Sequence, residues 1–431
     1  MNNINVIGAG LAGCEAANRL SNEGFHVTLY EMKPQKHTPA SKSDLFAELV
    51  CSNSLKAIRI ESAAGLLKEE MRRLDSLILK AADISTVPAG GALAVDREIF
   101  SQFITDKIKS NPNISVISKE ITEIPDGICV IATGPLTSDA FAQNLQNLLG
   151  NTLSFFDAVA PIVSADSIDM DKVFLGARYD RGDADYINCP MNKEEYDAFY
   201  DALISAERAP LHDFDVMDPK VYEGCMPVEV MASRGRDTLC YGPLRPVGLT
   251  DPRTGKRPFA NIQLRKENKE GTMYNLVGFQ TNLKFPEQKR VFGLIPGLEH
   301  AEFYRYGVMH RDTFIDSPRL LSPNLSLRKN ADLFFAGQLT GVEGYIESAA
   351  SGIVAGINAA RKAQSMPSFI LPEETMLGSL IRYITDENVK DFQPMGANMG
   401  ILPPMENRIR HKDERYMALA QRSLKSLEEM L

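Results

Sequence analysis

A glycine-rich turn close to the N-terminus constrains the fold of this chain more than any other feature. Gly8, Gly10 and Gly13 stand between a β-rich run and a helical pattern, and a second β-rich run ends at Glu31. This order is a βαβ half-unit, in which the glycines permit a tight turn, close approach to a pyrophosphate and close helix–strand packing. A carboxylate at the position of Glu31 can accept hydrogen bonds from ribose hydroxyls. The sequence therefore predicts a dinucleotide site.

Two later segments favour FAD over NAD as the dinucleotide. A short strand ends in Ala132-Thr133-Gly134, which resembles the middle motif of flavoproteins with two dinucleotide folds. A buried strand at residues 332–336 is followed by Gly337 and a helix of small residues, which resembles their C-terminal flavin motif, with Gln338 where Asp is usual. We assign the cofactor contacts to Gly8, Ala9, Gly10, Leu11, Ala12, Gly13, Glu31, Arg97, Thr133, Gly134, Gly337 and Gly344.

The pattern of turns divides the chain. Between about residues 150 and 325, turn signals are frequent and most β-rich runs are short, which is typical of an α+β domain. We therefore expect an α/β protein with a Rossmann-like, FAD-binding domain formed by residues 1–150 and 326–431. An inserted α+β domain for substrate or RNA, residues 151–325, interrupts it. The C-terminal sixty residues are expected to be helical.

The composition excludes several classes of protein. The 431 residues are 44% hydrophobic and 24% charged, so disorder is not the main state. No apolar run reaches about 18 residues and no export signal begins the chain, so we expect a cytoplasmic protein without a membrane span. The net charge of −9 argues against nucleic acid on all sides but allows a local basic groove. No metal-ligand spacing is present, so no metal is expected. DNA is not expected as a partner.

Two of the six cysteines stand in unusual settings. No Cys-x-x-Cys occurs, which disfavours disulfide reductase chemistry. Cys51 precedes a helix expected to be capped near residues 52–54, and Lys56 adds positive charge; both would favour a thiolate. Cys225 lies in a turn bounded by Gly224 and Pro227. A lone cysteine is by default a small buried hydrophobic residue, so the residues alone leave the role of both open.

At this point the chain resembles a known family, the bacterial folate- and FAD-dependent tRNA (uracil-5-)-methyltransferases. The resemblance extends over nearly the whole chain, and its specific stretches are residues 8–15, 48–55, 223–229, 271–281, 305–311 and 341–348. Relatives that modify the wobble uridine with FAD and folate share the N-terminal half of the pattern but are much longer.

The resemblance implies a particular chemistry. FAD would carry the methylene carbon of 5,10-methylenetetrahydrofolate to C5 of a uracil in the T-loop of tRNA, and NADH or NADPH would supply electrons. The two functional cysteines of the family match Cys51 and Cys225. Thiolate addition at C6 would activate C5 of the uracil, and a second group would remove the C5 proton. Which cysteine has which role stays open.

Three alternatives to this function remain. They are the same chemistry on ribosomal RNA, a small-molecule flavin oxidoreductase, and a flavin-bearing RNA-binding module without activity. His310 and Arg311 are candidates for anchoring the folate tail or a phosphate. Four basic sets could together line an RNA groove. They are Lys68/Arg72/Arg73, Arg253/Lys256/Arg257, Lys284/Lys289/Arg290 and Arg408/Arg410/Lys412/Arg415.

Overall fold

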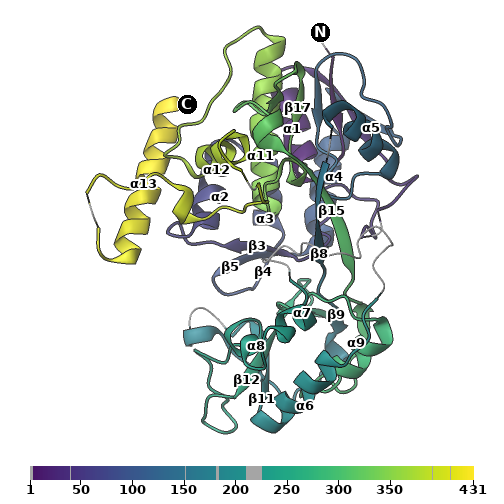
Figure 1. Ribbon diagram of the computed structural model, residues 1–431, viewed down its shortest axis with the longest axis vertical. Helices are drawn as coiled ribbons and strands as arrows, with labels where there is room; N and C mark the ends of the chain where they lie inside the picture. The colour runs from purple at the N-terminus through teal and green to yellow at the C-terminus, as the bar shows by residue number, and fades with distance from the viewer. Residues whose placement is uncertain are drawn as a thin grey trace.

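The chain folds into two lobes joined by a two-stranded ribbon (Figure 1). The computed structural model describes residues 3–38, 40–150, 152–180, 184–209, 226–390, 392–407 and 409–431. In the ribbon, β8 (Thr152–Ala158) pairs antiparallel with β15 (Met309–Ile315). The first lobe, at the top of Figure 1, contains both chain ends, and the second lobe contains β9 to β14. The chain thus enters and leaves the second lobe through neighbouring strands.

The main sheet of the first lobe contains the βαβ unit that the glycine motif predicts, formed by β1, α1 (Leu11–Asn22) and β2. Among the described residues its order is β16-β17-β7-β1-β2-β6, and only β16 runs antiparallel to its neighbour. The strand order reverses between β1 and β7, and ligands bind at such a switch point, beyond the carboxyl ends of the strands. The strands are β1 (Asn3–Ile7), β2 (His26–Glu31), β6 (Ile114–Ser118), β7 (Cys129–Ile131), β16 (Ser326–Leu327) and β17 (Asn330–Phe335). The predicted α/β class is confirmed.

Small residues allow α1 (Leu11–Asn22) and α11 (Tyr345–Ala363) to pack closely. A Cβ at Gly352 would lie 2.2 Å from the carbonyl oxygen of Ala12, so this position accepts only glycine without a shift of the backbone. This contact brings the two glycine motifs, far apart in the sequence, to the same end of the sheet.

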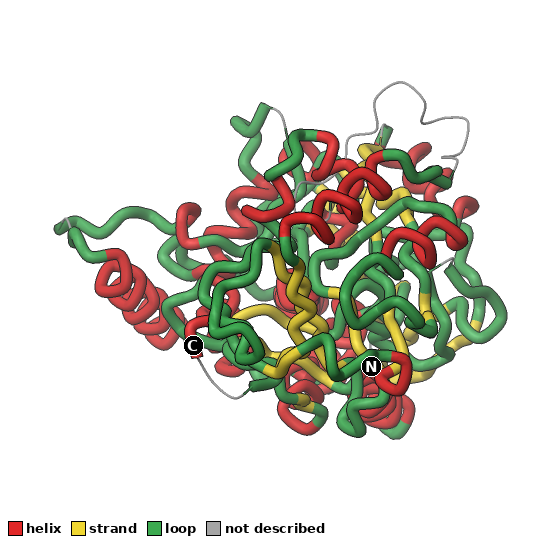
Figure 2. Tube along the Cα trace, turned by 90° about the horizontal axis from the view of Figure 1, so that it is seen from below, coloured by secondary structure: helices red, strands yellow, loops and turns green. Residues whose placement is uncertain are grey.

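The other helices of the first lobe surround this pair. They are α2 (Ala63–Arg73), α3 (Leu77–Ile84), α4 (Arg97–Lys109), α5 (Asp139–Leu149), α10 (Ser317–Leu320), α12 (Met376–Thr385) and α13 (Lys412–Met430). A small sheet is formed by β3 (Ser54–Ala57), β4 (Thr86–Val87) and β5 (Ala92–Val95). Next to the C-terminus, α13 stands at one edge of the molecule (Figure 2).

A buried carboxylate connects three of these helices. Glu70 of α2 accepts hydrogen bonds from the backbone N–H groups of Met376 (2.7 Å) and Leu377 (2.8 Å), at the start of α12, and from the hydroxyl of Ser423 in α13. Burial raises the pKa of Glu70 to about 7, although the hydrogen bonds oppose this effect. The C-terminal helix is thereby fixed to the lobe by a group that titrates near neutral pH.

The second lobe has its own antiparallel sheet and its own core. Within the part of the chain described, the strand order is β10-β11-β12-β13-β9-β14. Its hydrophobic core, which includes Phe199, Phe279 and Phe292, is separate from that of the first lobe. The elements are β9 (Ile162–Ser164), β10 (Phe174–Leu175), β11 (Tyr186–Met191), β12 (Ala260–Lys266), β13 (Met273–Leu276), β14 (Phe303–Arg305), α6 (Lys193–Ile204), α7 (Val228–Ser233), α8 (Thr238–Tyr241) and α9 (Phe285–Phe292).

Candidate functional site

The glycine-rich turn forms a cradle at the switch point of the main sheet. Gly8 has a φ of +97°, and a Cβ there would lie 2.5 Å from the carbonyl oxygen of Ala132 at the end of β7. A Cβ at Gly13 would lie 1.8 Å from the carbonyl oxygen of Gly8. Gly10 is the N-cap of α1, and no atom lies within 4 Å of a Cβ placed on it. The positive end of the α1 dipole therefore faces open space, where an anion such as pyrophosphate is stabilised.

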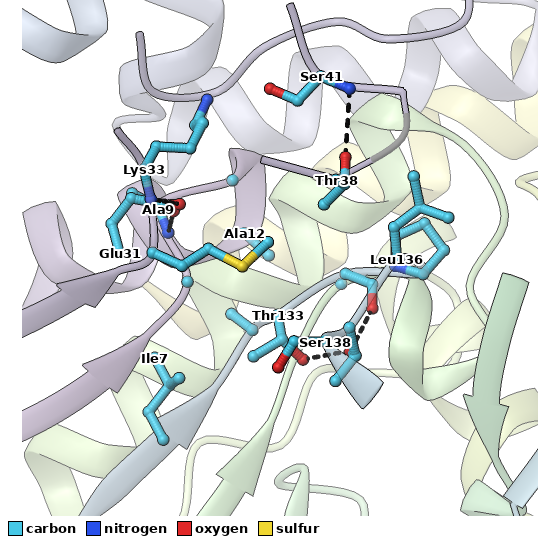
Figure 3. A pocket seen from close by; sticks show the side chains of 18 of the residues that line it. Ile7, Ala9, Ala12, Glu31, Lys33, Thr38, Ser41, Thr133, Leu136 and Ser138 are labelled. Carbon is cyan, nitrogen blue, oxygen red and sulfur yellow. Dashed lines mark hydrogen bonds between the residues drawn. The ribbon is translucent and has the colours of Figure 1, made fainter. Parts of the chain in front are cut away.

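Glu31 ends β2 beside this cradle. Its Oε2 accepts a 2.8 Å hydrogen bond from the N–H of Ala9, and its Oε1 accepts a 3.0 Å bond from the N–H of Lys33 (Figure 3). The residue is only 8% exposed, so these bonds fix the orientation of the carboxylate. Each carboxylate oxygen can accept a second hydrogen bond, and Glu31 can still bind ribose hydroxyls.

A cavity of about 1190 Å³, including space open to solvent, lies beyond the ends of β1 and β7. Figure 3 shows Ala9 and Glu31 at one part of its wall and Thr133, Leu136 and Ser138 at another. The predicted cofactor contacts that line it are Gly8, Ala9, Gly10, Leu11, Ala12, Glu31, Thr133, Gly134 and Gly337.

The remaining predicted site residues lie elsewhere. Gly13 packs against Gly8, and Gly344, with a φ of +125°, is the N-cap of α11. The guanidinium of Arg97 contacts the chain around Cys51, as described below. Cys225 lies outside the described residues, as do the side chains of His310 and Arg311.

Gln338 replaces the usual aspartate for a reason that the structure makes clear. Its amide Nε2 donates to Glu343 Oε2 (2.7 Å) and is 3.3 Å from Asp312 Oδ2. An aspartate at this position would add a third carboxylate to the pair and would have no N–H to donate.

The chain around Cys51 is held by side chains from four distant parts of the sequence. We call residues 49–53 the Cys51 segment. The hydroxyl of Tyr345, at the start of α11, accepts hydrogen bonds from the N–H groups of Cys51 (2.7 Å) and Ser52 (3.1 Å). Val50 and Tyr345 both line the cavity, so the segment borders the space in which the cofactor is expected.

An arginine cluster, defined as Arg97, Arg265 and Arg305 with Glu267, holds the other side of the Cys51 segment. Arg305 donates to the carbonyl oxygens of Val50 (2.8 Å) and Cys51 (3.1 Å). Arg97 donates to the carbonyl oxygen of Leu49 (2.7 Å) and is 3.4 Å from that of Cys51, while Arg265 donates to the side chains of Ser52 (2.6 Å) and Asn53 (2.9 Å). Two of the three arginines belong to the second lobe, so the segment is completed across the boundary between lobes.

The arginine cluster carries more positive than negative charge in a buried place. Burial lowers the pKa of Arg305 to about 10, and the neighbouring Arg97 acts in the same direction. Burial also opposes the charge of Arg97, but Glu267, with its Oε2 2.7 Å from Nε, raises the pKa of Arg97. Burial raises the pKa of Tyr345, which therefore stays neutral. An anion beside the cluster would be stabilised by the excess of guanidinium groups.

The sequence interpretation of the Cys51 region was wrong in its local structure. Residues 54–57 form strand β3 and not a capped helix. Lys56 instead pairs with Glu347 at 2.8 Å. The positive charge near Cys51 comes from distant arginines. Arg305 and Tyr345 stood within stretches of family resemblance, whereas Arg265 and Glu267 carried no separate signal.

One residue of the predicted basic sets is buried and cannot line an RNA groove. Lys68 is 1% exposed and donates to the carbonyl oxygen of Leu55 (2.7 Å), so it is not available to RNA. Arg73 pairs with Glu428 (2.7 Å) and Arg253 with Asp251 (2.8 Å). Arg408 lies outside the described residues. The set at residues 284–290 remains exposed on the second lobe. Within the described ranges, no three metal-ligating side chains cluster, and no helix is long and apolar enough to span a membrane.

The parallel sheet, the cradle and the cavity at the switch point define a Rossmann-like, FAD-binding flavoprotein. Comparison with known proteins identifies the family. The family described as "Glucose inhibited division protein A" matches residues 3–367, and the chain belongs to it. A relative from Shouchella clausii, named methylenetetrahydrofolate--tRNA-(uracil-5-)-methyltransferase TrmFO, is 58% identical over 99% of this chain and 98% of its own length. One of the same name from Halalkalibacterium halodurans is 59% identical over 99% and 98%. The family resemblance seen in the sequence is confirmed.

A solved structure agrees with the fold. GidA from Aquifex aeolicus superimposes with a TM-score of 0.72 at 17% identity, covering 99% of this chain and 76% of that one. At this identity the similarity supports the fold alone.

Proposed function

We propose that this protein transfers the methylene carbon of 5,10-methylenetetrahydrofolate to C5 of a uracil in the T-loop of tRNA, giving 5-methyluridine. The observation that carries the proposal is the identity of 58% over nearly the full length of a relative with this named activity. The substrate implies action in the cytoplasm. FAD would be the resident cofactor, and NADH or NADPH the source of electrons.

The residues present fit FAD. Gly10 leaves open the space that a pyrophosphate would take at the start of α1, and Glu31 stands where the ribose would follow. Thr133, Gly134 and Gly337 line the same cavity further on. When bound, FAD carries the one-carbon unit and the electrons between folate and uracil.

The cysteines supply the activation of uracil, because C5 is a poor nucleophile. A thiolate adds to C6, forming the S–C6 bond, and the electron pair of the C5–C6 double bond moves into an enolate that makes C5 nucleophilic. After C5 has bonded to the methylene carbon, a base removes the C5 proton, and the bond from that carbon to its carrier breaks. A hydride equivalent, drawn ultimately from NADH or NADPH, then reduces the carbon to a methyl group, and the S–C6 bond breaks to restore the thiolate. We assign the addition at C6 and the removal of the C5 proton to Cys51 and Cys225 without dividing them.

The arginine cluster and Tyr345 position Cys51 for this task. Six hydrogen bonds hold the backbone of the Cys51 segment: two N–H groups donate to Tyr345, and Arg97 and Arg305 each donate to two carbonyl oxygens. Positive charge beside a thiol favours the thiolate, which is the reactive form. Arg97, which we had assigned to FAD, is therefore proposed as a positioning residue. The lobe inserted at residues 151–325 is proposed to bind the RNA.

The test is transfer of label from methylene-labelled folate to unmodified tRNA, with NADPH present, followed by nucleoside analysis. We expect labelled 5-methyluridine from the wild type and none from Cys51→Ala, which should keep its yellow flavin. Cys240→Ala, in a half-buried cysteine of the second lobe, is the matched control and should keep activity.

Three outcomes would contradict the proposal. Product on ribosomal RNA but not on tRNA would favour the alternative substrate. NADPH oxidation with a small acceptor and no dependence on folate would favour a flavin oxidoreductase. Full methylation by Cys51→Ala would remove this cysteine from the mechanism.

A further inference from the structure

Three aromatic rings form a parallel stack on the second lobe. The rings of Phe303 and Tyr306 have centroids 4.9 Å apart with an interplanar angle of 12°, and those of Tyr306 and Phe285 are 4.6 Å apart at 15°. Tyr306 is the middle ring. Phe285 ends the stack and is 50% exposed, although it is a large apolar side chain. We call these three residues the aromatic stack.

The aromatic stack is built on rigid supports. Phe285 begins α9, and Phe303 belongs to β14, which pairs with β9 (Figure 1 shows α9 and β9 at the base of the ribbon). The buried amide of Gln288 in α9 donates to the carbonyl oxygen of Gly307 (2.7 Å) and accepts from its N–H (2.8 Å). The helix and the chain after β14 are therefore fixed to each other, and so are the rings that they carry.

Neighbouring residues link the cavity wall to the aromatic stack. Ser41 lines the cavity, and the exposed Lys42 follows it. Burial and the positive charge of Arg305 lower the pKa of Lys42. Arg305 holds Val50 and Cys51 by their carbonyl oxygens, and Tyr306 is the next residue in the chain. An RNA strand whose target uracil enters beside Cys51 would thus place a neighbouring nucleotide near the stack.

The charges around the aromatic stack suit a phosphate backbone. Lys284, Lys289 and Arg290 are exposed on α9 or at its N-cap, next to Phe285. Lys284 pairs with Glu207 (2.6 Å) and Arg290 with Glu287 (2.5 Å), but exposed ion pairs contribute little and exchange readily for phosphate. Sequence-specific RNA binding takes place mainly on unstacked bases, which lie against aromatic side chains.

We propose that the exposed face of Phe285 takes an unpaired nucleobase of the RNA substrate, so that the base continues the stack Phe303–Tyr306–Phe285. The target uracil must leave its own stack to reach a cysteine, and its neighbour loses a stacking partner. The aromatic stack replaces that partner and holds the strand while the uracil is modified. This inference rests on the proposed function and adds the surface that holds the opened strand.

Two substitutions at Phe285 distinguish stacking from simple apolar contact. Phe285→Leu keeps an apolar side chain but removes the π-face, and Phe285→Tyr keeps the ring. We expect the leucine variant to bind unmodified tRNA about 5- to 10-fold more weakly, at the low end of losses seen when stacking rings are removed. The tyrosine variant should bind like the wild type. Tyr241→Leu, at a residue that is 86% exposed elsewhere on the second lobe, is the control and should bind normally.

A fluorescent base gives a readout that is specific for stacking. A T-arm stem-loop carrying 2-aminopurine beside the target uridine should be quenched by the wild type and by Phe285→Tyr, and much less by Phe285→Leu at saturating protein. Flavin content and NADPH oxidation without RNA should be equal in all variants, because Phe285 does not line the cavity.

The outcomes also separate this inference from the proposed function. Equal tRNA affinity and equal quenching for Phe285→Leu and the wild type would overturn the stacking role, and tRNA methylation would still stand. The same result is expected if an apolar segment of a protein, and not RNA, binds at Phe285, because leucine makes an apolar contact as well as phenylalanine does. The wild type could instead bind RNA without methylating it, while Phe285→Leu loses the quenching. That result would support the stack and overturn the proposed function.

Discussion

The cradle and the Cys51 segment border the same cavity, but different parts of the chain build them. The cradle is local: its glycines lie within six residues, and the contacts that require them are to their own backbone and to the adjoining strand β7. The Cys51 segment is held by side chains from positions 97, 265, 305 and 345, and from both lobes. Cofactor binding and chemistry should therefore fail separately when each is damaged.

The largest effect is expected in the cradle. Gly10→Val should lose FAD and all methylation but keep the fold, because a Cβ at Gly10 meets no protein atom within 4 Å. Gly13→Val should lose FAD and also thermal stability, because its Cβ would lie 1.8 Å from the carbonyl oxygen of Gly8. Flavin absorbance and thermal unfolding of the two purified variants measure the difference. Retention of stoichiometric flavin by Gly10→Val would contradict a phosphate site at this position.

The next effect is expected in the arginine cluster. Lysine lacks the forked guanidinium group, so Arg305→Lys cannot donate to the carbonyl oxygens of both Val50 and Cys51 in the same way. Misplacement of a reacting group by about 1 Å lowers the reaction rate on the order of 100-fold. We expect kcat for methylation to fall roughly 10- to 100-fold, with flavin content and KM for folate unchanged. The matched control is Arg236→Lys, an exposed arginine of the second lobe that pairs with Asp197 and Asp201. A loss of flavin in Arg305→Lys equal to that in Gly10→Val would show that the two regions are not independent.

The smallest effect concerns stability within the first lobe, away from both regions. The pKa of Glu70 is raised to about 7 in the folded chain, so the folded state holds a proton that the unfolded state has already lost. Its contribution to the free energy of unfolding is present below about pH 4.5 and is lost as the pH rises to about 7, by roughly 1–3 kcal/mol.

Glu70→Gln should remove this part of the pH dependence, because an amide cannot ionise. Thermal unfolding between about pH 5 and pH 8 measures it, with Glu69→Gln, an exposed neighbour that pairs with Arg73, as the control. Methylation at pH 7 should change little in either variant. An unchanged slope in Glu70→Gln would assign the pH dependence to other groups, among them Glu15, whose pKa burial also raises to about 7.

The same contrast explains what the sequence could predict. The cradle depends on backbone geometry and on short spacing along the chain, and the sequence shows both directly, at Gly8, Gly10, Gly13 and Glu31. They predicted the unit β1–α1–β2, which the structure contains, but not the order of the remaining strands. The division at residues 150 and 325 stays a prediction, although the lobes have separate cores.

The arginine cluster was not predictable in the same way. Arg97 and Arg265 meet across 168 positions only after both lobes have folded, and neither has a neighbour in sequence that marks its role. From the sequence, the positive charge near Cys51 was assigned to a local helix and to Lys56. Both assignments were wrong, because residues 54–57 form a strand and Lys56 pairs with Glu347. The family resemblance identified Cys51 itself but gave no information about what holds it.

The ribbon β8–β15 has a consequence for how this architecture can change. An insertion that enters and leaves through neighbouring strands is a natural unit of exchange between proteins, because its removal leaves two adjacent chain ends. Here the unit also carries Arg265, Glu267 and Arg305, which complete a loop of its host. If the second lobe binds the RNA as proposed, a replacement lobe from another protein would serve this host only if it carried equivalents of these three side chains.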